Sequence, residues 1–151
     1  MRPGAILGVP TDVGRARPEG APDVPSARDP MADLAAPIIK KDPTGAALYA
    51  ARAYRTGDVV LDFADVEWRP KRDRHTVEDP CGMHFYHPVL AMVSHSCEPN
   101  CRIVLTGRVL VAARAIAIGE AITYDYETTE GWFSHPFRCL CGSPRCRNRI
   151  G

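Results

Sequence analysis

The sequence predicts a single small domain that is mostly β, with many short strands and little helix. Three observations support this fold class: two similar β-rich stretches, a hairpin pattern that leads into the second, and the overall composition. The chain has 151 residues, of which 45% are hydrophobic. That share is enough to bury one core in a domain of ordinary size.

The two similar stretches read LYAARAYRTGDVVLD, residues 48–62, and LVAARAIAIGEAITY, residues 110–124. Each predicts a strand, a tight turn at Gly57 or Gly119, and a second strand. Two copies this far apart do not make a solenoid. They indicate two similar β-units within one domain.

The chain divides into three parts by composition. Residues 1–37 contain seven of the 14 prolines and no aromatic residue or cysteine. They predict a disordered N-terminal arm, because such a segment buries too little apolar surface to offset the entropy of ordering it. Residues 38–134 are expected to form the folded domain, and residues 135–151 a cysteine-rich segment after it.

The middle of the chain joins the two copies. Residues 64–92 are polar and carry three prolines, so we expect an exposed, irregular connection. Residues 84–93, HFYHPVLAMV, predict a short helix or buried segment. Residues 102–114, RIVLTGRVLVAAR, predict a hairpin that turns around Gly107.

The charges nearly cancel, since 19 basic and 18 acidic residues give a net charge of +1. We therefore expect neither direct nucleic-acid binding nor attachment to an anionic membrane. No apolar run approaches the roughly 18–20 residues of a membrane span, and the first residues lack a secretory pattern. A cytoplasmic location is expected, in a bacterium judging by the Ala/Arg/Pro-rich composition, or a nuclear one in a eukaryote.

Six cysteines in such a protein suggest metal binding or catalysis before disulfides. Cys139, Cys141 and Cys146 form the pattern C-x-C-x4-C in FRCLCGSPRCR. Structural zinc takes four tetrahedral ligands, commonly thiolates. The spacing therefore predicts a zinc site with one distant ligand, for which the sequence offers Cys97, Cys101, Cys81 and His135.

Four segments in order resemble the SET-domain protein lysine methyltransferases with a post-SET zinc motif, in particular short stand-alone SET proteins. SHSCEPN, residues 94–100, is similar to their N-H-S-C-x-P-N motif. TGAALYAARAYRTGDVVLDF, residues 44–63, resembles their G-x-G-L segment, and GEAITYDY, residues 119–126, resembles G-E-E-L-T-Y-D-Y. FRCLCGSPRCR, residues 137–147, is similar to the post-SET C-x-C-G…C loop. The resemblance covers residues 38–151.

This resemblance implies a fold of small curved β-sheets with a C-terminal pseudoknot and a post-SET zinc loop. It implies that Cys97 is the fourth zinc ligand beside Cys139, Cys141 and Cys146. It further implies binding of S-adenosyl-L-methionine on one face and entry of a substrate lysine through a channel from the other.

The resemblance also assigns roles to individual residues. Tyr126 matches the catalytic tyrosine, and Tyr124 matches a position where a hydroxyl restricts the product to mono- or dimethylation. Asp125 is expected to be a structural carboxylate, and Asn100 to cap or bond the knot loop. The residues implied in cofactor binding are Gly45, Ala46, Ala47, Leu48, Tyr49, Ser94, His95, Trp132 and Phe137.

Two departures from the family pattern keep other functions open. Ala47 stands where the family has its second glycine, and Ser94 stands where it has asparagine. The leading interpretation is a lysine N-methyltransferase that acts on a protein or peptide of unknown identity. The alternatives are a methyltransferase of a small amine or amino acid in secondary metabolism, and an inactive zinc-stabilised SET-like binding module.

Overall fold

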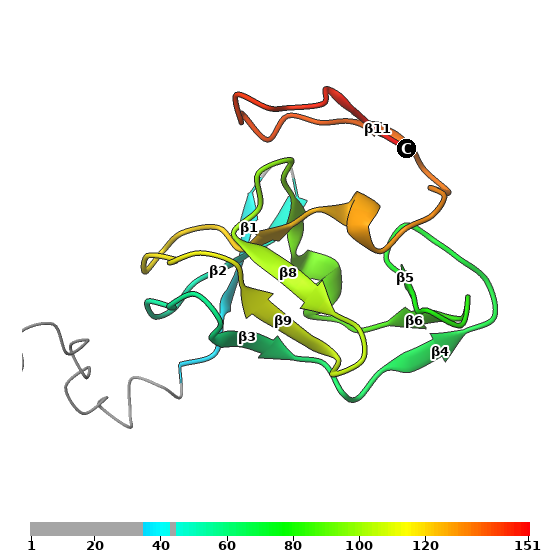
Figure 1. Ribbon diagram of the computed structural model, residues 1–151, viewed down its shortest axis with the longest axis horizontal. Helices are drawn as coiled ribbons and strands as arrows, with labels where there is room; N and C mark the ends of the chain where they lie inside the picture. Colours follow the sequence, from blue (N-terminus) through cyan, green and yellow to red (C-terminus); the bar gives the residue numbers. More distant parts are fainter. Residues whose placement is uncertain (1–34, 43–44) are drawn as a thin grey trace, which may run out of the picture.

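The computed structural model describes residues 35–42 and 45–151. Twelve short strands form five small sheets, and the described residues contain two 3-10 turns but no α-helix (Figure 1). This confirms the predicted class of a mostly β fold. Residues 1–34, most of the predicted N-terminal arm, lie outside the described residues.

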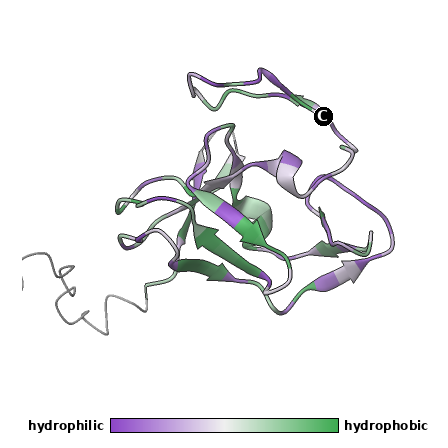
Figure 2. Cartoon of the chain, in the orientation of Figure 1, coloured by the Kyte–Doolittle hydropathy of each residue, from purple (hydrophilic) through white to green (hydrophobic). Residues whose placement is uncertain are grey.

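The central sheet has the strand order β3–β9–β8, and all its pairs are antiparallel. It is built from β3 (Val59–Asp62), β8 (Cys101–Val104) and β9 (Val109–Ala112). The predicted hairpin joins β8 to β9, and β9 is apolar along its whole length in Figure 2.

The two similar sequence stretches pair with each other about a local twofold axis. Tyr54 and Ile116 hold the same place in their copies, and each N–H donates to the other's carbonyl at 2.9 Å. On either side of this pair lie two equivalent hydrogen bonds, Gly57 N–H to Ala112 O at 2.8 Å and Gly119 N–H to Ala50 O at 2.7 Å. Gly57 and Gly119 have φ values of +90° and +80°, which favour glycine. The predicted pair of β-units is confirmed.

Residues 64–92 contain a sheet that the sequence analysis missed. The strands β4 (Glu67–Arg69), β5 (Val77–Glu78) and β6 (His84–Tyr86) pair in the order β4–β6–β5. The expectation of an irregular exposed connection was therefore wrong. Val77 and Phe85 are buried, and they anchor an otherwise polar segment to the core.

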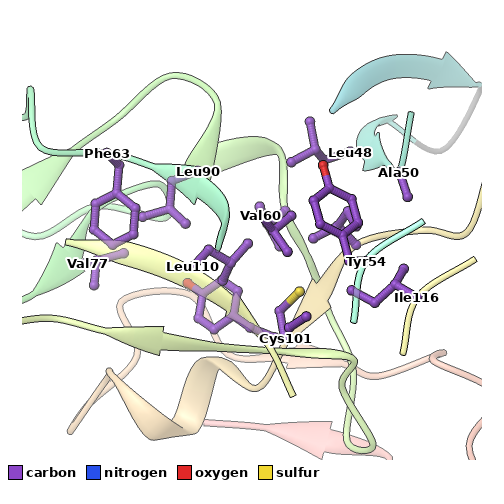
Figure 3. Close-up of a cluster of buried hydrophobic side chains, with 14 of the residues drawn as sticks. Leu48, Ala50, Tyr54, Val60, Phe63, Val77, Leu90, Cys101, Leu110 and Ile116 are labelled. Carbon is purple, nitrogen blue, oxygen red and sulfur yellow. The ribbon is translucent and has the colours of Figure 1, made fainter. Parts of the chain in front are cut away.

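A hairpin of β1 (Ile38–Asp42) and β2 (Gly45–Tyr49) precedes the central sheet. Beside β2 lies the 3-10 turn η2 (Leu90–Met92), which fits the prediction of a short helix or buried segment there. The fully buried side chains come from strands and loops of several sheets. They include Leu48, Phe63, Phe85, Leu110, Ile116 and Ile122. Several of the buried side chains are drawn in Figure 3.

Two segments far apart in the sequence cross where β7 (Ser94–His95) pairs in parallel with β10 (Thr123–Tyr124). Asn100 holds this crossing, because its side chain accepts from Thr123 N–H at 2.9 Å and donates to Ala121 O at 2.7 Å. The predicted role of Asn100 in the loop is confirmed.

The cysteine-rich segment carries the last pair, β11 (Phe137–Arg138) with β12 (Arg149–Ile150). It lies along one side of the molecule, next to the turn η3 (Tyr126–Thr128) that follows β10 (Figure 1). Among the described residues, no helix has the length and apolar character needed to span a bilayer.

Candidate active site and metal centre

Two tyrosines stand at the end of β10, beside the crossing. Tyr124 is buried and Tyr126 is partly buried, with ring centroids 4.8 Å apart. The Tyr126 hydroxyl donates to Val93 O at 2.6 Å. Burial raises the pKa of Tyr126 to about 12 and raises the pKa of Tyr124 further. Both tyrosines therefore carry neutral hydroxyl groups at pH 7, and neither is a phenolate base.

His95 connects the tyrosines to the cysteines. Burial lowers its pKa, so the ring is neutral at pH 7. Its Nδ1 accepts the N–H of Tyr126 at 3.2 Å, so its Nε2 carries the proton and faces Cys97 Sγ at 3.4 Å. The ring also stands edge-on to Tyr126 and Phe137, with centroids 5.2 and 5.8 Å away.

The predicted zinc ligands come together. The sulfur atoms of Cys97, Cys139, Cys141 and Cys146 all lie within 4.8 Å of one another. A tetrahedral zinc with Zn–S bonds of about 2.3 Å places its sulfurs about 3.8 Å apart, and Cys97 Sγ lies 3.8 Å from Cys139 Sγ. Four thiol donors in this arrangement fit structural zinc.

Backbone N–H groups of the tail point at two of these sulfurs. Arg147 N–H donates to Cys97 Sγ and Asn148 N–H to Cys146 Sγ, both at 3.4 Å. Such hydrogen bonds stabilise thiolate ligands around a metal. The cluster is therefore surrounded by donors, including the Nε2 proton of His95, that suit a negatively charged sulfur set.

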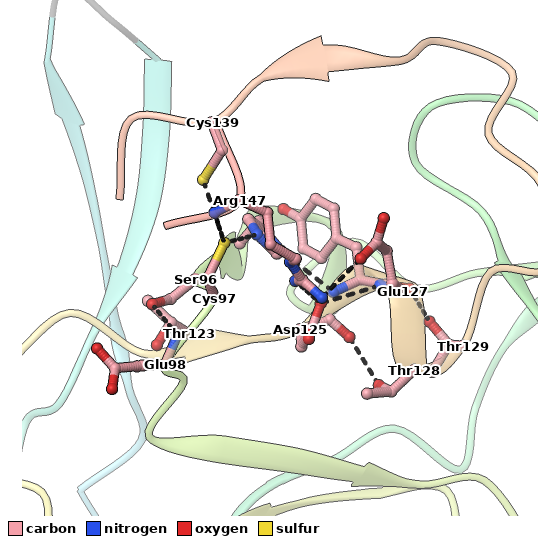
Figure 4. Close-up of polar contacts among 12 residues, drawn as sticks. Ser96, Cys97, Glu98, Thr123, Asp125, Glu127, Thr128, Thr129, Cys139 and Arg147 are labelled. Carbon is pink, nitrogen blue, oxygen red and sulfur yellow. Dashed lines mark hydrogen bonds and ion pairs between the residues drawn. The ribbon is translucent and has the colours of Figure 1, made fainter. Parts of the chain in front are cut away.

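Ion pairs connect the tail to the turn η3. The Arg147 guanidinium lies 2.6 Å from a carboxylate oxygen of Asp125 and 2.6 Å from one of Glu127 (Figure 4). Asp125 also accepts the N–H of Glu127 and lies 3.7 Å from Nδ1 of His95. These contacts confirm the prediction that Asp125 is a structural carboxylate.

Two cavities meet at Tyr126 and Phe137. The tyrosine cavity has a volume of about 640 Å³, and the cysteine-side cavity has a volume of about 430 Å³. The tyrosine cavity is lined by residues 72–77, Leu90, Ala91, Val93, Tyr124, Tyr126, Glu130 and residues 133–137. The cysteine-side cavity is lined by residues 94–96, Thr123, Tyr126, Phe137 and residues 139–141. One tyrosine and one phenylalanine are thus shared by both cavity walls.

Some of the predicted cofactor residues line a cavity, and others do not. Ser94, His95 and Phe137 line the cysteine-side cavity. The range Gly45–Tyr49 forms β2 and lines neither cavity, and the Leu48 side chain lies in the core. Trp132 is 66% exposed.

The remaining cysteines take no part in the cluster. Cys101 is buried in the core, where burial raises the pKa of its thiol to about 12, and Cys81 is exposed. His135, another proposed ligand, lines the tyrosine cavity instead. Four residues were candidates for the distant ligand. Of these, Cys97 is the one that the structure places beside Cys139, Cys141 and Cys146.

A group of charged residues in the tyrosine cavity was missed by the sequence analysis. Glu130 and Arg72 line this cavity, and their side chains are 10% and 14% exposed. Burial raises the pKa of Glu130 to about 7. Local spacing in the sequence carried no signal for this group, because Arg72 and Glu130 are far apart in the chain and meet only in the folded structure.

A knotted crossing, a tyrosine pair between two cavities and a four-cysteine tail define a class of β domain. Residues 45–127, more than half of the chain, match the family model of the SET domain. The chain belongs to the SET-domain family.

Two curated relatives illustrate the similarity. Histone-lysine N-methyltransferase ash1 of Drosophila melanogaster is 45% identical over 65 residues, which cover 39% of this chain and 3% of that protein. Histone-lysine N-methyltransferase ATX2 of Arabidopsis thaliana is 29% identical over 133 residues, covering 70% of this chain and 12% of that protein. The chain thus spans a small part of the length of these relatives.

The fold is similar to that of solved structures. A crystal structure of KRYPTONITE in complex with mCHH DNA, H3(1-15) peptide and SAH matches with a TM-score of 0.56 and 23% sequence identity. The match covers 74% of this chain and 28% of that one. At this identity the similarity supports the SET fold.

Proposed function

We propose that the protein is an S-adenosyl-L-methionine-dependent N-methyltransferase that acts on a lysine of a protein or peptide. The observation that carries the proposal is the position of Tyr126 in the wall shared by two cavities. A transfer between two molecules that enter from opposite sides needs such a meeting point. The names of the relatives, histone-lysine N-methyltransferases, agree with this reaction.

The cysteine-side cavity is the proposed cofactor side. Ser94 and His95 lie there on β7, and Phe137 offers an aromatic surface against which an adenine can pack. The related KRYPTONITE structure contains SAH, the product form of this cofactor. When bound, S-adenosyl-L-methionine supplies a methyl group made electrophilic by its sulfonium.

The tyrosine cavity is the proposed lysine side. An amine attacks a methyl group only as the neutral base and only in line with the bond that breaks. The aromatic walls formed by Tyr124, Tyr126 and Phe133 disfavour the charged ammonium. The Tyr126 hydroxyl donates its hydrogen bond to Val93 O, so the lone pairs of its oxygen remain available to the reacting centre.

Tyr124 is proposed to limit the product to mono- or dimethyl-lysine. Its hydroxyl is within hydrogen-bonding reach of the Thr129 side chain and occupies space in the cavity. We expect Tyr124→Phe to shift the product toward trimethyl-lysine, with turnover for the first methyl within about threefold of the wild type. Mass spectrometry of a methylated peptide checks this. A product distribution that does not change contradicts this role of Tyr124.

Titration calorimetry with S-adenosyl-L-methionine tests the proposal against an inactive binding module. An enzyme is expected to bind the cofactor with a micromolar dissociation constant and to transfer labelled methyl groups to lysine peptides. Absence of binding to the zinc-loaded protein would contradict the proposed function. Transfer to free amines but not to peptides would identify a small-molecule enzyme instead.

A further inference from the structure

Glu130 occupies a specific place next to the tyrosines. The turn η3 continues through a hydrogen bond from Glu130 N–H to Tyr126 O at 3.1 Å. This bond places Glu130 one turn after Tyr126, on the wall of the tyrosine cavity. The charge of the Glu130 carboxylate also acts on Tyr124, because it contributes to the raised pKa of that tyrosine.

The negative charge of Glu130 is poorly compensated. One carboxylate oxygen accepts Glu78 N–H at 3.3 Å, and the other lies 4.0 Å from Arg72 Nε. The Arg72 guanidinium is engaged elsewhere, by the Glu78 carboxylate, the carbonyl of Trp132 and the Trp132 ring. A carboxylate that is 10% exposed, with its nearest counter-charge on Arg72 4.0 Å away, thus lies in a cavity that it shares with two tyrosines.

The other polar groups of the cavity wall are less suited to hold a cation. The two tyrosines are neutral, and the Tyr126 hydroxyl already donates to Val93 O. Asp73 is exposed and accepts the N–H of His75. Arg74, His75 and His135 are exposed bases. Among the described residues that line this cavity, the acids are Asp73 and Glu130, and Glu130 is the one whose side chain is largely buried.

We propose that Glu130 binds the protonated amine of the substrate in the tyrosine cavity and accepts its proton. This inference rests on the proposed methyl transfer. The ammonium N–H bond breaks and an O–H bond forms on Glu130, which leaves a neutral amine and a neutral carboxylic acid. The amine lone pair then forms an N–C bond to the methyl of the proposed sulfonium donor as the methyl–sulfur bond breaks, which leaves a methylated ammonium and a neutral thioether. Glu130 later releases its proton to water.

Burial of the ammonium and of the Glu130 carboxylate favours transfer of the proton from the amine to Glu130. A buried ammonium and a buried carboxylate each lose hydration, and moving one proton removes both charges. Desolvation has the largest effect on the pKa of Glu130 and raises it. The Glu78 N–H and Arg72 lower this pKa and the Glu78 carboxylate raises it a little, so that it lies at about 7. The pKa of Glu130 is thus nearer to that of an amine, ordinarily about 10.4 for lysine, than the pKa of an ordinary carboxyl group is.

Glu130→Gln is the direct test, because glutamine keeps the size and the oxygen that accepts Glu78 N–H. The substrates are an equimolar acetylated heptapeptide library with lysine at the centre, and tritiated S-adenosyl-L-methionine. We expect wild-type kcat/KM to rise with pH through about 7, as Glu130 loses its proton, and the variant to lack this rise. At pH 7.5 the variant should be slower by about a hundredfold.

A second peptide library separates proton transfer from a structural role. Its central side chain ends in an aminooxy group, a nucleophile that is already neutral at pH 7. We expect Glu130→Gln to methylate this library within about threefold of the wild type. The surface variant Glu67→Gln, whose side chain is 63% exposed, is the matched control for both libraries. Equal losses on both libraries overturn the proton-acceptor role.

Binding of n-butylammonium chloride, a mimic of the lysine side chain, tests the site without methyl transfer. NMR shifts of the Tyr124, Tyr126 and Phe137 amides should saturate in the wild type and at least tenfold more weakly in Glu130→Gln. Wild-type methylation with an unaffected Glu130→Gln overturns the inference and leaves the proposed function standing. Glu130-dependent binding in a protein that transfers no methyl supports the ammonium site and contradicts the proposed function.

Discussion

Tyr126 makes the most specific contacts of the site. Its hydroxyl donates to Val93 O, its ring packs edge-on to His95, and its backbone N–H fixes the tautomer of that histidine. Of these three parts, only the hydroxyl is proposed to take part in methyl transfer, whereas the ring and the backbone stabilise the crossing of β7 with β10. Removal of this one oxygen therefore separates catalysis from folding.

Tyr126→Phe is expected to lower the rate of methyl transfer by about a hundredfold or more, because an oxygen near the reacting methyl is lost. Single-turnover assays with labelled cofactor measure this rate. Calorimetry should show cofactor affinity within about threefold of the wild type. A variant that transfers methyl groups at the wild-type rate would remove Tyr126 from the reaction.

Glu120 contributes to stability rather than to chemistry. Burial alone would raise its pKa, but hydrogen bonds from the Arg114 side chain, Ala117 N–H and Asn100 lower it to about 2. Because the folded pKa is depressed, the stabilisation is complete above about pH 4.5. It is lost as the pH falls toward 2.

Glu120→Gln is expected to lower the free energy of unfolding at pH 7 by about 1–2 kcal/mol, the usual loss for charge-assisted hydrogen bonds. Urea denaturation at pH 7 and at pH 2.5 measures the effect, and the difference from wild type should shrink at the lower pH. An equal difference at both pH values would show that ionisation of Glu120 is not its cause.

At the scale of single residues, the predictions for Cys97, Asn100 and Asp125 were correct. Cysteine spacing alone left four candidates for the distant ligand, and the family resemblance pointed to Cys97. Glu130 could not be predicted in this way. Its environment depends on Glu78 in β5 and on Arg72 in the connection between β4 and β5, both more than fifty residues earlier in the chain.

Among the elements, the cysteine-rich tail depends most on its metal centre. It pairs only β11 with β12, two residues each, and its ion pairs through Arg147 lie at a surface where such pairs contribute little. Yet this tail brings Phe137 into the wall of both cavities. The four cysteines are thus expected to hold the cofactor side closed.

Removal of zinc by a chelator is expected to release the tail while the central sheet persists. Amide hydrogen exchange of residues 138–150 should become faster by about tenfold or more, with β8 and β9 unchanged. Cofactor affinity should fall in parallel, because Phe137 leaves the site. Unchanged protection of the tail after complete metal removal would show that the ion pairs hold it instead.

The elements differ in how well the sequence predicts them. The β8–β9 hairpin follows from local turn chemistry between two β-rich runs, and it was predicted correctly. The β4–β6–β5 sheet was missed because its strands are two or three residues long and polar at half of their positions. Only Val77 and Phe85 turn inward, and their burial depends on packing against Phe63 and other distant core residues.

The whole molecule is a set of sheets that are too small to be stable separately. The local twofold pairing of the two β-units joins the first half of the domain to the second. The parallel pairing of β7 with β10 then brings His95, Tyr124 and Tyr126 to one place. The knotted arrangement of a SET domain thus assembles a site from residues that are distant in sequence.

The central claim is that this assembled site transfers methyl groups to lysine. Mass spectrometry of a lysine-centred peptide library, incubated with the zinc-loaded protein and deuterated S-adenosyl-L-methionine, tests it most directly. The expected result is one or two deuterated methyl groups on the lysine amine, with the signal lost in Tyr126→Phe. Absence of any labelled lysine, in a protein that is folded and binds the cofactor, would contradict the account.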